Sequence, residues 1–87
     1  MVGRLESEIR ALIARERYLA LDVAALGDRD DLYRAGLTSH DTVNLMLALE
    51  DRFGVEFPDR LLTRRTFQTI ADLAAALREL LPDETPA

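Results

Sequence analysis

Residues 36–59 read Gly-Leu-Thr-Ser-His-Asp-Thr-Val-Asn-Leu-Met-Leu-Ala-Leu-Glu-Asp-Arg-Phe-Gly-Val-Glu-Phe-Pro-Asp, and they predict the central helix of this protein. The predicted helix covers residues 39–53 and is apolar around more than half of its circumference. One stripe along it consists of Val43, Met46, Leu47, Glu50 and Phe53. Thr38 and Asp41 have the spacing of a capping box at its start, and Gly54 suits its end. Such a helix either lies centrally in a core or presents an apolar edge to a partner.

Two further helices are predicted, one on each side of this stretch. Residues 4–18 place apolar side chains on one helical face, at Leu5, Ile9, Leu12 and Ile13. Residues 67–81 do the same with Ile70, Leu73, Ala74, Leu77 and Leu81. Either Thr66 or Thr69 can cap this last helix. Two amphipathic helices beside a more apolar one predict a small helical bundle.

The connections between these helices differ in length. Residues 20–37 are irregular, but scattered apolar residues predict that this long loop packs on the bundle. Residues 55–58 are interpreted as an extended link. Residues 59–65 are predicted to form one short helical turn with Leu61 and Leu62 facing inward. Arg60, Arg64 and Arg65 give that turn a small basic corner. The fold class is therefore all-α, with three main helices, one short helix and a long first loop.

Composition limits the size of the protein and the partners it can bind. The 87 residues are expected to form one domain, with its core over about 4–81 and a flexible tail at 82–87. The net charge of −5 argues against nucleic acid and anionic membranes as partners. No apolar run approaches the length of a membrane span, and the N-terminus is charged, so a cytoplasmic location is expected.

The sequence offers little for catalysis or for metal binding. There is no cysteine, and the single histidine, His40, follows Ser39 directly. Neighbouring residues on a helix point about 100° apart, so a Ser39–His40 dyad is not expected. Asp28, Asp30 and Asp31 hint at a calcium loop, but the glycine and glutamate that an EF-hand needs are missing from the matching positions. We therefore predict no metal site, a solvated acidic loop, and no enzymatic activity.

Ser39 remains as the residue whose side chain could be covalently modified. It lies at the start of an apolar helix, three residues after Gly36. Helix N-termini favour anions, so a phosphodiester on this hydroxyl would lie in a compatible field. Serine is also common as a helix cap, and on these residues alone a capping role for Ser39 is the stronger interpretation.

The whole stretch from 36 to 59 resembles the central segment of acyl carrier proteins. In that family a glycine precedes the modified serine by three positions, which matches Gly36 and Ser39, and an acidic residue follows, here Asp41. The apolar helix, its Glu and Phe, and a closing apolar-Pro-Asp also match, at Glu50, Phe53 and Phe57-Pro58-Asp59. The flanking helices resemble the family more weakly, so that nearly the whole chain is covered.

The resemblance implies a four-helix bundle that carries a prosthetic group. Ser39 would bear 4′-phosphopantetheine, added by a phosphopantetheinyl transferase, and the arm's thiol would hold an acyl or aminoacyl group as a thioester. Partner enzymes would dock on the second helix. By position, the docking residues would be Asp41, Val43, Leu47, Glu50 and Asp51.

Some residues depart from the pattern of fatty-acid carriers. Thr38 replaces the usual aspartate, His40 replaces an apolar residue, and Asn44 stands where an acid is usual. The run from Thr42 to Phe53 also looks like carriers of activated amino acids, such as D-alanyl carriers. A monomeric, specialised carrier is therefore favoured, served by an acyl- or amino-acid-activating ligase and a downstream acyltransferase or synthase. The alternative is an unmodified, carrier-like docking or adaptor module.

Overall fold

The structure is a computed structural model that describes residues 3–16 and 23–81. The predicted end of the first helix at 18, the start of the long loop and the tail at 82–87 lie outside these residues. The described chain forms helices α1 (Arg4–Glu16), α2 (Ser39–Phe53) and α3 (Ile70–Leu80). It also forms two 3-10 turns, η1 (Val23–Ala25) and η2 (Asp59–Leu61). Within the described ranges there is no strand, which confirms the all-α class.

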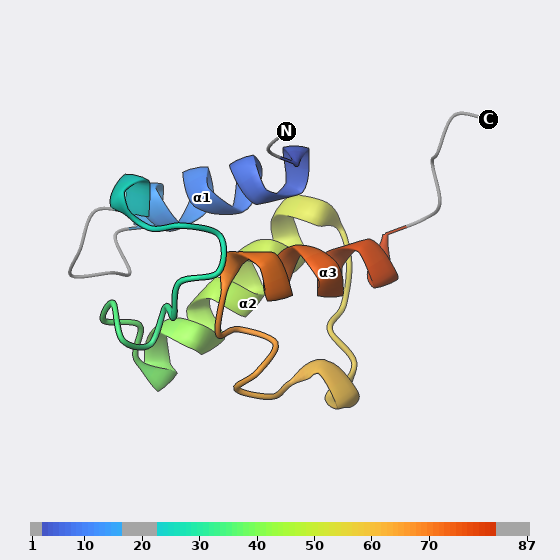
Figure 1. The fold of residues 1–87 in the computed structure, drawn as a ribbon. Helices are drawn as coiled ribbons and strands as arrows, with labels where there is room; N and C mark the ends of the chain where they lie inside the picture. The colour runs from blue at the N-terminus through green and yellow to red at the C-terminus, as the bar shows by residue number, and fades with distance from the viewer. Residues whose placement is uncertain (1–2, 17–22, 82–87) are drawn as a thin grey trace.

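The three helices meet around one core, with α1 and α3 lying across α2 (Figure 1). The predicted apolar faces of α1 and α3 are the buried ones. In α2, however, the buried residues are Leu45 and Leu49, whereas Val43 and Leu47 from the predicted stripe are exposed. The largest fully buried side chains are Ile9, Ile13, Leu32, Leu45, Leu49, Ile70, Leu73 and Leu77. The second helix thus lies in the core and also presents an apolar edge to solvent.

The long first connection is packed, as predicted. Leu32 and Leu37 are buried, and the turn η1 lies within a stretch that the sequence left irregular. Two main-chain hydrogen bonds fasten the loop to the start of α3: Leu32 N–H donates to the Gln68 carbonyl (2.8 Å) and Ala71 N–H donates to the Asp28 carbonyl (2.9 Å). Buried apolar anchors and satisfied main-chain groups explain why such a loop is ordered.

The acidic cluster in this loop stays wholly or partly exposed, as predicted, and its carboxylates also accept hydrogen bonds within the chain. The Asp28 carboxylate accepts hydrogen bonds from Arg10 Nε (3.1 Å) and Nη2 (2.6 Å), which ties the loop to α1. Asp30 Oδ2 accepts from the Gly27 N–H at 2.7 Å. Asp28 therefore has a partner on another helix, which residue spacing alone could not reveal, and Asp30 has one within its own turn.

The second connection differs from the prediction in two respects. The short turn is limited to η2, and Leu62, predicted to face inward, is 45% exposed. The last helix begins at Ile70 and not at residue 67, because the Thr69 hydroxyl caps it by accepting from the Asp72 N–H at 2.9 Å. Phe67 is buried in the preceding turn, where its ring centroid lies 5.6 Å from that of Phe57. The two rings thus anchor a segment that carries little regular structure.

Candidate functional site

Ser39 is the first residue of α2, and its side chain is exposed. The residue that caps the helix is Thr38: its Oγ1 accepts from the Asp41 N–H at 3.0 Å, and Asp41 Oδ2 accepts from the Thr38 N–H at 3.1 Å. This capping box confirms the predicted start and excludes the alternative in which Ser39 is the cap. The Ser39 hydroxyl has no hydrogen-bond partner within the described part of the chain. It is therefore available for chemistry.

The backbone turn that leads to Ser39 explains why a glycine stands three residues before it. Gly36 has a φ of 118°, a conformation that side-chain-bearing residues rarely adopt. This turn returns Leu37 to the core, where its N–H donates to the Leu32 carbonyl at 3.0 Å. The chain then emerges at Thr38, so that Ser39 follows a firmly anchored residue by only two positions.

Replacing Thr38 by alanine is expected to lower the free energy of unfolding by about 1 kcal/mol, because the Asp41 N–H at the helix start loses its acceptor. Chemical denaturation followed by circular dichroism measures the change. Thr42→Ala is the matched control, since the Thr42 hydroxyl donates to the Thr38 carbonyl one turn back at 2.9 Å and to the Tyr33 hydroxyl at 3.5 Å, and neither bond satisfies an N–H at the helix start. Equal stability of the Thr38 variant and the wild-type protein would contradict a capping role.

A groove of about 360 Å³ opens beside Ser39. Its lining consists of Tyr33, Ser39, Thr42, Val43, Met46, Leu62, Thr63, Arg64 and Phe67. Most of this lining is apolar, and residues from the long loop, α2 and the second connection contribute to it. Sequence analysis did not find this groove, because it depends on how the second connection folds against α2. Leu62, which lines the groove, was predicted to face inward and therefore did not indicate it.

One wall of the groove is a stack of Arg64 on Tyr33, with the guanidinium carbon 3.9 Å from the ring centroid. Desolvation pushes the pKa of the nearby Asp31 carboxyl upward. Hydrogen bonds from Gln68 and from main-chain N–H groups, together with the charge of Arg64, outweigh that effect and leave the pKa below its ordinary value. Asp31 is thus ionised at neutral pH, and it braces this wall by accepting from the Tyr33 N–H at 2.9 Å.

The five predicted docking residues do not all face solvent in the same way. Val43 is 53% exposed and Leu47 is 52% exposed, and Asp51 follows them on the same ridge at a spacing of four. The carboxylates of Asp41 and Glu50 are engaged within the chain: Asp41 in the capping box, and Glu50 by accepting from the Phe57 N–H at 2.8 Å. The exposed ridge is therefore made by Val43, Leu47 and Asp51.

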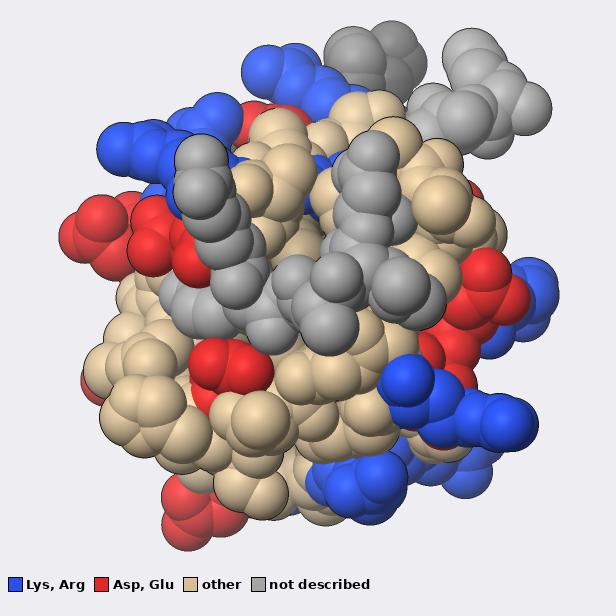
Figure 2. Space-filling model, turned by 90° about the vertical axis from the view of Figure 1, so that its left-hand side faces the viewer, with Lys and Arg blue, Asp and Glu red and all other residues tan. Residues whose placement is uncertain are grey.

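One face of the molecule illustrates how charge is distributed over the described surface. Figure 2 views the molecule from the left-hand side of Figure 1, and on that face acidic side chains lie among the basic ones around uncharged surface. Among residues 3–16 and 23–81, no group of three or more His, Cys, Asp or Glu side chains is placed to hold a metal ion. In the same ranges no helix combines the length and the apolar character that crossing a membrane requires.

Comparisons with known proteins agree with this geometry. A model of the family described as "Phosphopantetheine attachment site" matches residues 7–77. The chain is 36% identical over 83 residues to an aminoacyl carrier protein of Agrobacterium fabrum, covering 95% of this chain and all of that protein.

Solved structures give the same picture. One match is a chain in the crystal structure of an engineered Bradyrhizobium japonicum glycine:[carrier protein] ligase complexed with carrier protein from Agrobacterium tumefaciens and ATP. It has a TM-score of 0.82 and 37% identity, covering 87% of this chain and 99% of that one. A second match is in the structure of the Bradyrhizobium japonicum ligase with glycylated carrier protein, with a TM-score of 0.74 and 30% identity, covering 85% of this chain and 99% of that one. With a family match over most of its length and full-length relatives of this similarity, the chain belongs to the phosphopantetheine-binding carrier proteins.

Proposed function

We propose that this protein is an aminoacyl carrier that holds an amino acid as a thioester on a 4′-phosphopantetheine arm attached to Ser39. The observation that carries the proposal is the exposed Ser39 hydroxyl, which has no partner in the described chain and opens onto an adjacent groove. The single domain over residues 1–87 is part of the same proposal.

The residues around Ser39 fit such an arm. A transferase must bring the hydroxyl to a phosphorus atom, and the exposed first turn of α2 leaves room for that approach. The phosphodiester formed there is an anion, which the free N–H groups and dipole of a helix start favour. The arm supplies the thiol for the thioester, and the absence of cysteine from the chain means that no other thiol competes with it.

The chain's own residues position the cargo and do not react with it. His40 is exposed and adjacent to Ser39, and no hydrogen bond joins the two side chains among the described residues. A general base needs hydrogen-bond reach of the group it serves, so no nucleophile–base pair is present here. We therefore place all catalysis of loading and transfer in partner enzymes and none in this protein.

An amino acid is the cargo that the relatives favour. The matched chains include an aminoacyl carrier protein and a carrier protein found glycylated on a glycine ligase. The residues that depart from fatty-acid carriers, Thr38, His40 and Asn44, agree with this choice. The proposed partners are a phosphopantetheinyl transferase, an amino-acid-activating ligase and a downstream acyltransferase or synthase. Because activation uses ATP, we propose a cytoplasmic site of action.

The test is stepwise loading followed by intact-mass spectrometry. Incubation with coenzyme A and a broad-specificity transferase should add the mass of one arm. Subsequent incubation with ATP, an amino-acid-activating ligase and glycine should add one glycyl group, which hydroxylamine removes because it is a thioester. No arm with any of several transferases would reject the proposal. Loading of acyl groups but no amino acid would reject the aminoacyl cargo alone.

Docking of the ligase is expected to use the exposed ridge of α2. Leu47→Ala should lower kcat/KM for ligase charging of the arm-bearing protein about tenfold, since truncating one of the few residues that anchor an interface costs above 1 kcal/mol. Steady-state charging with radiolabelled amino acid measures this change. Asp51→Asn should weaken charging more at low salt than at high salt, because exposed charges mainly steer association.

Asp59→Asn is the matched control for Asp51, because both aspartates are exposed but Asp59 lies in η2. It should charge as the wild-type protein does. Unchanged charging of the Leu47 variant would show that the ligase docks elsewhere.

A further inference from the structure

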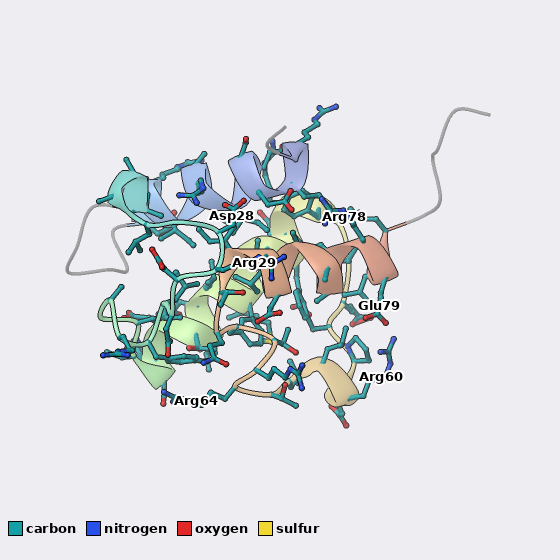
Figure 3. The ribbon with its side chains drawn as sticks, viewed as in Figure 1. Asp28, Arg29, Arg60, Arg64, Arg78 and Glu79 are labelled. Carbon is teal, nitrogen blue, oxygen red and sulfur yellow. The ribbon has the colours of Figure 1, made fainter. Side chains whose placement is uncertain are left out.

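The three arginines of the basic corner, Arg60, Arg64 and Arg65, have different surroundings in the structure. Arg60 Nη1 lies 3.0 Å from Glu79 Oε1, at the far end of the molecule from the start of α2 (Figure 3). Arg65 borders a separate hollow that Glu79 and Asp72 also line. Arg64 lies toward the end of the molecule where α2 begins, and it lines the same groove as Ser39. Among the described residues of that lining, Arg64 is the only charged side chain.

The guanidinium of Arg64 is positioned but not neutralised by a direct ion pair. Its flat face stacks on Tyr33 at 3.9 Å, which limits its freedom and leaves the N–H groups at its edge available. Asp31 contributes a longer-range attraction, but no carboxylate of the described residues lies within 4.0 Å of Arg64. An arginine held this way has unused donors for an anion.

The groove has two chemical parts. Arg64 supplies positive charge, while Val43, Met46, Leu62 and Phe67 supply apolar surface, and none of the described residues that line the groove is acidic. A phosphopantetheine arm has the matching order: an anionic phosphodiester at its attachment point, followed by an uncharged chain with two methyl groups. Planar guanidinium groups bind phosphate oxygens through paired N–H donors. The groove thus offers a complementary surface to each of the two parts of the arm.

We propose that Arg64 is a positioning residue that binds the phosphodiester of the arm and directs the pantetheine chain into this groove. The inference rests on the proposed attachment at Ser39. It adds a resting position for the arm on the protein surface and a residue that maintains it. A charged amino group on the cargo would find no acidic partner there, so the aminoacyl end stays at the mouth of the groove, within reach of enzymes.

The experiment compares NMR spectra of the protein before and after transfer of the arm. In the wild-type protein the Met46 and Leu62 methyl signals should shift when the arm is added, with a change at the Arg64 side-chain Nε–H. In Arg64→Gln these methyl shifts should fall, with a roughly threefold lower ratio of groove-bound to free arm, the size typical of a solvent-exposed charge pair. Arg65→Gln is the matched control: it removes the same charge from the adjacent exposed residue and should behave as the wild type.

The outcomes separate three claims: attachment of the arm at Ser39, binding of the arm in the groove, and the role of Arg64. If mass spectrometry finds no arm on the wild-type protein, the attachment proposal fails and this inference fails with it. If the arm is present but the Met46 and Leu62 signals do not move, the groove is not its resting place. If the signals move equally in Arg64→Gln and in the wild type, Arg64 does not hold the arm. Equal loss in both arginine variants would indicate an effect of net charge and would also overturn the assignment.

Discussion

Replacement of Ser39 by alanine should abolish addition of the phosphopantetheine arm while leaving the fold intact. The variant lacks the oxygen to which the phosphorus would be joined. The helix start should survive, because Thr38 and Asp41 form the capping box and the Ser39 hydroxyl takes no part in it. Alanine also has the highest helix propensity, so the free energy of unfolding should change by no more than about 0.5 kcal/mol. Intact mass after transferase treatment, and chemical denaturation, measure the two effects.

Ser7→Ala is the matched control, because Ser7 is the only other serine in the chain and is likewise exposed, on α1. It should accept one arm as the wild-type protein does. An arm on the Ser39 variant would show that another hydroxyl is modified. In cells, full activity of a strain carrying Ser39→Ala would favour the unmodified adaptor over the carrier, and loss of activity would exclude that adaptor.

Replacement of Leu49 by alanine should cause a large loss of stability, of the size expected for a fully buried residue of α2. Leu49 is 0% exposed and belongs to the core shared by the three helices. Removing a fully buried leucine side chain costs about 2–5 kcal/mol, through lost burial and the cavity left behind. A domain of this length is stable by roughly 4–13 kcal/mol in total. We expect a variant that unfolds at much lower denaturant concentration, as followed by circular dichroism at 222 nm.

Leu47→Ala makes the same chemical change two residues away in the same helix, where the side chain is 52% exposed. It should alter the free energy of unfolding by less than about 0.5 kcal/mol. If both variants were equally stable, the assignment of the inner and outer faces of α2 would be wrong. If only Leu49→Ala is destabilised, any loss of ligase charging in Leu47→Ala belongs to docking and not to folding.

The features that could be predicted from sequence are those decided by short-range patterns. The capping box of Thr38 and Asp41 located the start of α2, and Gly54, with a φ of 66°, located its end. Apolar spacing correctly predicted the buried faces of α1 and α3. The resemblance over residues 36–59 led to the carrier family, which the family match confirms.

The features that could not be predicted depend on contacts between distant segments. Asp28 pairs with Arg10, eighteen positions away, and no local pattern indicates which carboxylate finds such a partner. In α2 so many positions are apolar that periodicity alone could not separate the buried Leu49 from the exposed Leu47. The groove depends on the paths of two connections. Leu62 was predicted to face inward because it is apolar, but apolar character alone does not tell whether a side chain faces the core or the surface.

Two of the hydrogen bonds that join the loop before Ser39 to the start of α3 use only main-chain atoms: Leu32 N–H donates to the Gln68 carbonyl and Ala71 N–H donates to the Asp28 carbonyl. Neither bond depends on the identity of a side chain, so mutation of the exposed residues in both segments leaves the joint in place. Exposed side chains in these segments can therefore change without moving the serine. Such a scaffold is well suited to acquiring new enzyme partners during evolution.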